Sequence, residues 1–212
     1  MTATNPIPSL SRWFAPVPAG SPSPKLLRAI GLVGAGQLAT GIAHWCATKG
    51  FGVIMHDKEA ATLTHSVEVI RGLFRTAVAR HEITAAEAHK AMGGIGITTS
   101  VEDMEFCDMV IETIEEDAAA KRARFAELAR LMPQDSVLAS CASEADLEEL
   151  FVVTTEPGRV IGLSFSEPVD ASREIQVIIG SQTGHETAVR VLTFSATLDK
   201  TPVVNGKARC SP

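Results

Sequence analysis

Residues 29–57 read AIGLVGAGQLATGIAHWCATKGFGVIMHD, and this stretch decides the fold. AIGLVG (29–34) is a short apolar run typical of a buried strand, and FGVIMHD (51–57) is a second one. Between them, QLATGIAHWCATKG (37–50) reads as a helix that ends at a glycine. A strand, a tight turn, a helix and another strand predict the first βαβ unit of a nucleotide-binding sheet.

The turn between the first strand and the helix carries a G-x-G-x-x-A motif. Gly34 permits a tight turn, Gly36 lets the backbone approach a pyrophosphate, and Ala39 lets the helix pack closely on the strand. The amides of Gln37 and Leu38 open the helix, where its dipole favours a phosphate group. The motif therefore predicts a dinucleotide site at this turn. A glycine-rich turn without a ligand is the alternative.

Asp57 ends the second strand, 21 residues after Gly36. A carboxylate at this distance can accept hydrogen bonds from both hydroxyls of an adenosine ribose. It would repel a 2′-phosphate, so we expect NAD to be preferred over NADP. The neighbouring Lys58 weakens that discrimination slightly.

The rest of the chain alternates apolar runs with longer amphipathic segments. We expect helices over 59–80, 84–92, 117–132, 145–151 and 185–198, and strands over 96–99, 108–113, 136–140, 159–165, 174–180 and 201–204. Apolar strands that alternate with helices predict an α/β, Rossmann-like, doubly wound and mostly parallel sheet with helices on both faces. Residues 1–25 hold six of the eleven prolines, so we expect a flexible tail or linker there and a single domain over 26–212.

Composition excludes several classes of function. The 212-residue chain has a net charge of −6 with mixed signs, which argues against nucleic-acid binding. No apolar run reaches the roughly 20 residues that span a membrane, and no secretory signal is recognisable. The four cysteines form no CxxC pair, and neither they nor the histidines suit a metal site. We therefore expect a cytoplasmic protein with free thiols and no metal.

Several further segments carry a resemblance to a known family. They are ITTSVEDMEFCDMVIETIEED (97–117), KRARFAELARLMPQDSVLAS (121–140), RVIGLSFSEPV (159–169) and KTPVV (200–204). Together with the opening stretch, they resemble the NAD-binding domain of 3-hydroxyacyl-CoA dehydrogenases over residues 28–204. That family oxidises L-3-hydroxyacyl-CoA to 3-ketoacyl-CoA with NAD, a step of fatty acid β-oxidation. Its members add a helical domain that completes the site and forms the dimer.

The resemblance implies three more cofactor contacts. The family's glutamate near the nicotinamide ribose falls on Glu116, its lysine on the following helix falls on Lys121, and its serine falls on Ser143. Each residue also has a plain structural interpretation. Glu116 would be an acid at a helix start, Lys121 a surface lysine, and Ser143 a helix N-cap.

The catalytic positions of the family are replaced in this chain. The family motif H-F-F-N-P corresponds to SFSEP, so Ser164 stands for the histidine that acts as general base and Glu167 for the asparagine. Gln176 stands for the glutamate that orients this histidine. A serine hydroxyl is no base near neutral pH, and loss of a positioned base costs about 10² to 10⁴ in rate.

We therefore expect an NAD-binding domain with weak or no dehydrogenase activity and with acyl-CoA as the implied partner. We expect the family's second domain to be missing after residue 204, either because this chain is part of a longer protein or because the gene encodes only the cofactor half. The oligomeric state therefore stays open. Two alternatives remain at this point. One is a non-catalytic nucleotide-binding or regulatory module. The other is an active oxidoreductase on an unusual substrate, with Glu167 or a residue from a missing domain or subunit as the base.

Overall fold

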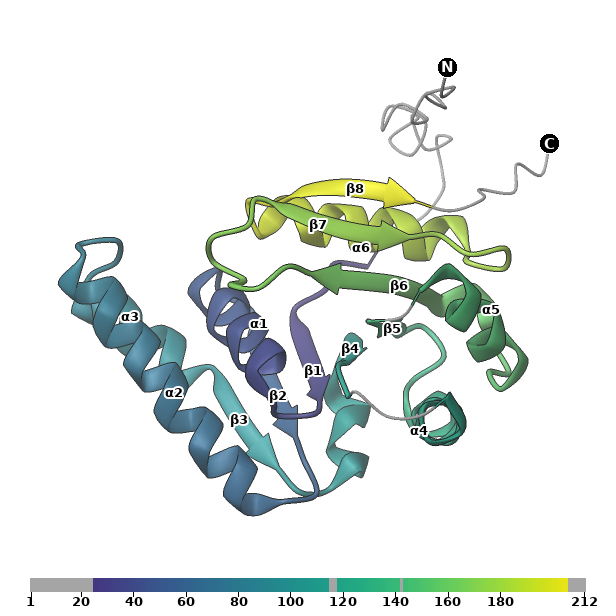
Figure 1. Cartoon of the computed structure of the whole chain (residues 1–212), viewed down its shortest axis with the longest axis horizontal. Helices are drawn as coiled ribbons and strands as arrows, with labels where there is room; N and C mark the ends of the chain where they lie inside the picture. The colour runs from purple at the N-terminus through teal and green to yellow at the C-terminus, as the bar shows by residue number, and fades with distance from the viewer. Residues whose placement is uncertain (1–24, 115–117, 142, 206–212) are drawn as a thin grey trace.

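The computed structural model describes residues 25–114, 118–141 and 143–205. Within these ranges eight strands form one sheet in the order β3-β2-β1-β4-β5-β6-β7-β8 (Figure 1). Their bounds are β1 (Ala29–Val33), β2 (Gly52–His56), β3 (Ile95–Thr98), β4 (Met109–Glu112), β5 (Val137–Ser140), β6 (Val160–Phe165), β7 (Glu174–Ile178) and β8 (Thr201–Asn205). Each predicted strand is present, with ends that differ by two residues at most.

Six α-helices lie within the same ranges. They are α1 (Gln37–Thr48), α2 (Ala60–Ala79), α3 (Ala85–Gly93), α4 (Ala118–Leu131), α5 (Glu144–Val152) and α6 (His185–Thr197). Two short 3-10 helices, η2 (Val101–Phe106) and η3 (Pro157–Arg159), were not predicted. They have six and three residues, which is two turns and one turn, and they are too short to leave a helical period in the sequence.

The sheet is parallel from β1 to β6, and its last two strands run the other way. β6 pairs with β7 antiparallel, and β7 pairs with β8 parallel. The β6–β7 connection has only eight residues, Ser166–Arg173. A parallel connection needs a dozen or more residues, so this link forces a reversal of direction. The predicted fold class, a mostly parallel Rossmann-like sheet, is confirmed.

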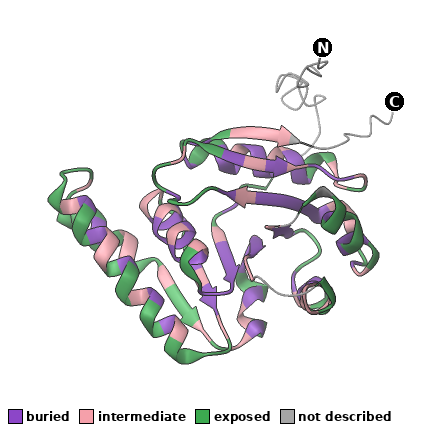
Figure 2. Ribbon diagram, in the orientation of Figure 1, coloured by how far each residue is buried: buried purple, intermediate pink, exposed green. Residues whose placement is uncertain are grey.

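Two apolar clusters cover the two faces of the sheet, and Figure 2 shows the buried strands between them. One cluster joins the strands to α1, α6 and the α2–α3 pair, with Ile42, Ile70 and Phe194 among its members. The other joins them to η2, α4 and α5 through residues such as Met104 and Phe125. Both faces of the central strands β1, β4, β5 and β6 are thus shielded from water, which explains why these strands are mainly apolar and do not alternate.

The predicted tail lies almost wholly outside the described residues. Its last residue, Lys25, is described, and its ammonium group lies 3.2 Å from the carboxylate of Asp108 and 3.0 Å from that of Asp135. The division into a tail and one domain stays a prediction.

Three thiols, those of Cys46, Cys107 and Cys141, are free. Burial raises the pKa of each to about 12, so all three stay protonated at neutral pH. Across the described ranges, no group of three or more metal-ligating side chains converges, and no helix is both long and apolar enough to cross a membrane.

Candidate functional site

A groove of about 770 Å³ lies at the carboxyl ends of β1, β2 and β4. In doubly wound sheets this edge is where ligands bind. Eight of the predicted site residues line the groove together: Gly34, Gly36, Gln37, Leu38, Asp57, Lys121, Ser164 and Glu167. Chain segments that are far apart in the sequence therefore meet at one place.

Gly34 makes the turn out of β1 and has a backbone that favours glycine. Its φ is +104°, in the left-handed region, and its amide donates to the carbonyl of His56 over 2.9 Å. A Cβ atom here would lie 2.8 Å from Thr113 Oγ1 and 2.9 Å from Ile114 Cγ1. Conformation and space both require glycine at this position.

Gly36 is the N-cap of α1, and its surroundings are open. No side-chain hydrogen bond caps this helix, and a Cβ atom on Gly36 would meet no other atom within 4 Å. The first amides of α1 border the groove without a side chain in front of them. Such a helix start suits an anionic group, because the free N–H groups and the dipole both favour negative charge. The residues present therefore fit a pyrophosphate.

Asp57 lies beside the glycine turn and helps to hold it. Its Oδ2 accepts from the amide of Ala35 over 3.1 Å, and its Oδ1 accepts from the amide of Glu59 over 3.0 Å. Each carboxylate oxygen has a second lone pair, so ribose hydroxyls can still donate to it. Lys58 also lines the groove, next to this carboxylate.

Lys121 is not the surface lysine of the structural interpretation. Its side chain is only 15% exposed, and its ammonium group lies 3.0 Å from Glu112 at the end of β4. Glu112 is 1% exposed and also accepts from the amide of Ile114 over 2.7 Å and from the hydroxyl of Ser140 over 2.8 Å. These contacts hold the ammonium group of Lys121 in one position at the groove.

Sequence reasoning missed Glu112, and the sequence did contain a signal for it. The residue is a carboxylate inside an otherwise apolar strand, DMVIET, and a buried acid requires partners. His56 and Arg124 also line the groove and were missed. Burial and, to a smaller degree, the charge of Arg124 lower the pKa of His56, whose Nδ1 has no partner among the described residues.

Ser164 and Gln176 face each other across two strands. They are directly paired in the antiparallel register of β6 and β7, and both are half-buried. Opposite residues of such a pair have Cβ atoms about 4.5–5.5 Å apart, on one face of the sheet. Ser164 lines the groove, whereas Gln176 does not. The side chains of Ser164 and Gln176 therefore lie side by side.

One further predicted cofactor residue, Ser143, does not line the groove. Ser143 is exposed and caps α5, where its hydroxyl and the carboxylate of Asp146 form a reciprocal capping box. The N-cap interpretation of Ser143 is thereby confirmed, and its cofactor role stays a prediction. Glu116 lies outside the described residues.

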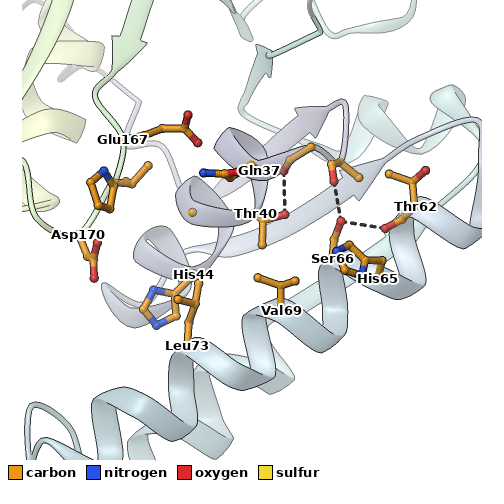
Figure 3. A pocket seen from close by; sticks show the side chains of 15 residues that line it. Gln37, Thr40, His44, Thr62, His65, Ser66, Val69, Leu73, Glu167 and Asp170 are labelled. Atoms are coloured by element: carbon orange, nitrogen blue, oxygen red, sulfur yellow. Dashed lines mark hydrogen bonds between the residues drawn. The ribbon is translucent and has the colours of Figure 1, made fainter.

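A second cavity, of about 450 Å³, adjoins the groove (Figure 3). The two share four lining residues, namely Ala35, Gly36, Gln37 and Glu167. One wall of the cavity is α2, which contributes Ser66, Val69 and Leu73. The opposite wall is the β6–β7 connection, from which the carboxylates of Glu167 and Asp170 extend.

Hydrogen bonds from Lys200 hold the β6–β7 connection in place. This lysine is 4% exposed, and its ammonium group donates to the carbonyls of Val169 over 2.5 Å and of Ser172 over 2.6 Å. The same group lies 4.9 Å from the centre of the Trp45 ring. These contacts hold in place the segment that brings Glu167 to the junction of the two cavities.

His44 lies on α1 in the wall of the second cavity. It is 7% exposed, its ring packs edge-on against Phe74 with centroids 4.5 Å apart, and its Nε2 has no partner among the described residues. Burial lowers its pKa, and the negative charge of Asp170 opposes this only partly. The imidazole is therefore neutral at pH 7.

Comparisons with known proteins agree with this geometry. The family described as "3-hydroxyacyl-CoA dehydrogenase, NAD binding domain" matches residues 29–208. The probable 3-hydroxybutyryl-CoA dehydrogenase of Bacillus subtilis is 33% identical over 177 residues, covering 84% of this chain and 62% of its own length. The 3-hydroxybutyryl-CoA dehydrogenase of Bradyrhizobium diazoefficiens is 32% identical over 180 residues, covering 85% of this chain and 61% of its own length.

Solved structures show the same relationship. That of (S)-3-hydroxybutyryl-CoA dehydrogenase from Ralstonia eutropha has a TM-score of 0.82 and 28% identity, over 86% of this chain and 64% of the other. The chain thus spans about three fifths of the length of these relatives. The resemblance seen in the sequence is confirmed, and this chain belongs to the 3-hydroxyacyl-CoA dehydrogenase family, whose NAD-binding domain it contains.

Proposed function

We propose that the chain binds NAD in the groove at the carboxyl ends of β1, β2 and β4. The open start of α1 supports this most directly, because it leaves backbone amides facing space that a Cβ atom would not fill. Asp57 would accept from the adenosine ribose, and Lys121 would lie toward the nicotinamide half, as the family resemblance implies. The bound cofactor would supply the ring that accepts a hydride.

A single substitution should block the ligand site without disturbing the fold. Gly36 has φ −71° and ψ −174°, an extended conformation that any residue adopts, so Gly36→Val leaves the backbone unstrained. Its side chain would fill the phosphate space. We expect NADH titration to show binding to the native chain and a loss of affinity of about 100-fold or more in this variant, since several charge-assisted hydrogen bonds are blocked.

Gly72→Ala on α2 is the matched control, because a Cβ atom there also meets nothing within 4 Å and the position does not line the groove. It should bind NADH as the native chain does. An unchanged affinity in Gly36→Val, or no NADH binding by the native chain, contradicts the proposal.

We further propose that the family reaction is weak or absent in this chain. The carrying observation is the cross-strand pairing of Ser164 with Gln176. The sequence resemblance aligns these two positions with the family's general base and its orienting carboxylate. Neither a hydroxyl nor an amide takes up a proton near neutral pH. A 3-hydroxyacyl-CoA thioester is the proposed ligand of the second cavity. Neither Ser164 nor Gln176 would remove the proton from its hydroxyl group. The chain would then act as a nucleotide-binding module.

Reduction of acetoacetyl-CoA with NADH, followed at 340 nm, tests this. We expect a rate at least about 10² below that of a family member with an intact base, which is the lower end of what a positioned base contributes. Turnover comparable with that of such an enzyme would show that the site is not degenerate.

A second candidate, an oxidoreductase that uses Glu167 as its base, is favoured by one observation. Glu167 lines both cavities at their junction, where a cofactor ring and a substrate would meet. Any measurable turnover should then disappear in Glu167→Gln, which keeps the shape and removes the basic oxygen. Glu156→Gln is a control, because Glu156 is exposed and lines neither cavity. Equal residual rates in both variants would exclude this candidate.

A further inference from the structure

A third cavity, of about 390 Å³, lies at the amino ends of the strands, opposite the end of the sheet that carries the glycine turn. Its walls are the segments that lead into β1 and β2 and one side of α6. Parallel neighbours begin at the same edge of a sheet, so these two segments meet at the amino ends of the strands. None of its lining residues belongs to the groove or to the second cavity.

The charged side chains that line this cavity are all positive, whereas the chain as a whole is negatively charged. Lys25, Arg28, Lys49 and Arg190 line it and no aspartate or glutamate does, although the chain carries a net charge of −6. Two of these cations are partly neutralised by acids beyond the cavity. Lys25 contacts two aspartates, and Lys49 lies 2.5 Å from the carboxylate of Asp199. The exposed guanidinium of Arg28 makes no ion pair within the described ranges.

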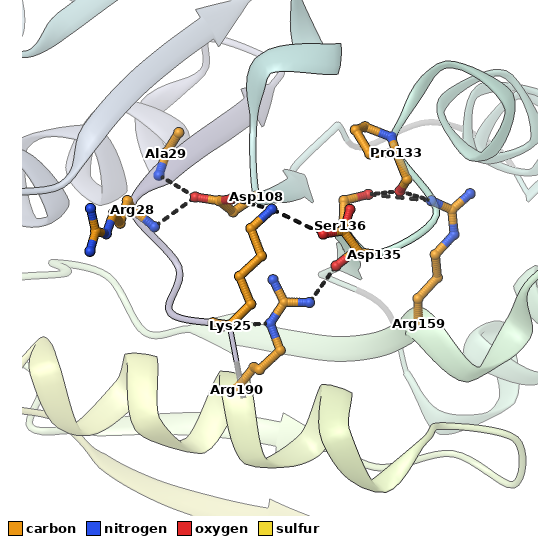
Figure 4. Close-up of polar contacts among 9 residues, drawn as sticks. All are labelled: Lys25, Arg28, Ala29, Asp108, Pro133, Asp135, Ser136, Arg159 and Arg190. Atoms are coloured by element: carbon orange, nitrogen blue, oxygen red, sulfur yellow. Dashed lines mark hydrogen bonds and ion pairs between the residues drawn. The ribbon is translucent and has the colours of Figure 1, made fainter. Parts of the chain in front are cut away.

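Arg190 is the most unusual of the four cations. It is 6% exposed, its Nε donates to the carbonyl of Lys25 over 2.9 Å, and its Nη1 donates to the carbonyl of Asp135 (Figure 4). Its Nη2 is buried and has no partner in the described structure. An unpaired donor on a buried charge is costly, because the group has lost its water and gained nothing in return. The two carbonyl contacts hold the Arg190 guanidinium in the wall of the cavity, where its charge adds to the positive potential.

The cavity also has an apolar side. Phe51 and Phe194 line it and are buried, with their rings packed edge to face at 5.1 Å between centroids. Leu27, also buried, adds to this surface. A ligand that fills the cavity therefore needs an apolar body beside its charged group.

We propose that this cavity binds a small phosphorylated molecule with an apolar or aromatic body. Arg28 holds the phosphate, Lys25, Lys49 and Arg190 add positive potential, and the body of the ligand rests against Phe51 and Phe194. A phosphate dianion suits a cavity lined by four cations better than a carboxylate, which carries one charge. The site is separate from the cofactor groove, so it stands whether or not the chain binds NAD.

Calorimetric titration with phenyl phosphate at fixed ionic strength tests the proposal, with and without NADH. We expect saturable binding that NADH does not displace, and that is tighter than binding of inorganic phosphate or of benzoate. Arg28→Ala should weaken it by about ten-fold or more, the effect of losing one charge-assisted contact. Arg71→Ala is the control, since Arg71 is an exposed arginine on α2 that pairs with Glu68. It should leave binding unchanged.

A second variant tests the same cavity without changing an arginine. Thr197→Glu places a negative charge on an exposed position of the cavity wall and should abolish phenyl phosphate binding without unfolding the chain. Absence of saturable binding by the native chain overturns the proposal, as do equal affinities in Arg28→Ala and Arg71→Ala. Displacement by NADH would assign the anion to the cofactor groove instead. Benzoate binding as tight as that of phenyl phosphate would overturn the assignment of a phosphate.

Discussion

At the residue scale, single atoms decide what the glycine turn can accept. Gly34 and Gly36 are two positions apart, yet they make opposite demands. A Cβ atom on Gly34 would collide with Thr113 and Ile114, whereas one on Gly36 would meet no other atom within 4 Å. The first glycine therefore belongs to the fold and the second to the proposed site.

Gly34→Ala should destabilise the chain without any ligand present. The left-handed backbone costs a residue with a Cβ atom about 1–3 kcal/mol, and the contact of 2.8 Å with Thr113 adds to that cost. We expect a lower free energy of unfolding in urea titrations. Gly50→Ala is a useful comparison, because Gly50 has φ +87° but no atom near its Cβ position. It should lose less stability than Gly34→Ala.

Asp57 should set the preference for NADH over NADPH. The native chain is expected to bind NADH more tightly, because the carboxylate repels a 2′-phosphate. In Asp57→Ala this preference should shrink by about ten-fold or more, since the repulsion and two ribose contacts disappear together. Competitive titration with the two nucleotides measures it. An unchanged ratio would mean that the ribose lies elsewhere.

At the element scale, helix starts are used in two ways in this structure. α3 and α5 begin with closed capping boxes, Thr84 with Glu87 and Ser143 with Asp146. α1 begins without any side-chain cap, as do α2 and α6, and its first residues, Gln37 and Leu38, line the groove. A helix whose first amides are satisfied internally has little to offer a ligand, whereas the uncapped α1 has several free donors.

The two capping boxes allow the two interpretations of Ser143 to be separated. Ser143→Ala and Thr84→Ala each remove a cap and should each lower the free energy of unfolding by about 1 kcal/mol. Thr84 is remote from the groove, so its variant should bind NADH normally. If Ser143 also contacts the cofactor, Ser143→Ala alone should weaken NADH binding. Equal NADH affinity in the two variants would leave Ser143 with the capping role only.

At the scale of the whole molecule, local patterns proved predictable and long-range register did not. The glycine turn, Asp57 and the order of elements follow from short stretches, because a turn and a helix start are made by neighbouring residues. The pairing of Ser164 with Gln176 depends on the reversal at β7, and that of Lys121 with Glu112 depends on how α4 lies on the sheet. The same holds for His44 Nε2 and His56 Nδ1, which have no hydrogen-bond partner among the described residues because of how distant segments pack around them.

Those buried imidazoles predict how stability depends on pH. Burial lowers the pKa of His44 and His56 below 6.5, so the unfolded chain takes up protons that the folded chain refuses. The free energy of unfolding should therefore fall as the pH drops below about 6.5, by up to ~1.4 kcal/mol per pH unit for each proton. Urea titrations between pH 7.5 and 5 measure this slope. His44→Met should flatten it, and an identical slope would show that His44 does not contribute.

The order of strands in the sheet also has a consequence for how the chain reaches this structure. Ile30 of β1 pairs with Val53 of β2 on one side and with Met109 of β4 on the other. During synthesis at about 5–20 residues per second, β1 can pair with β2 early, but its other edge waits on the order of ten seconds for β4. An apolar strand with an open edge invites association with other chains. The nascent chain is therefore most vulnerable to aggregation between the emergence of β2 and that of β4.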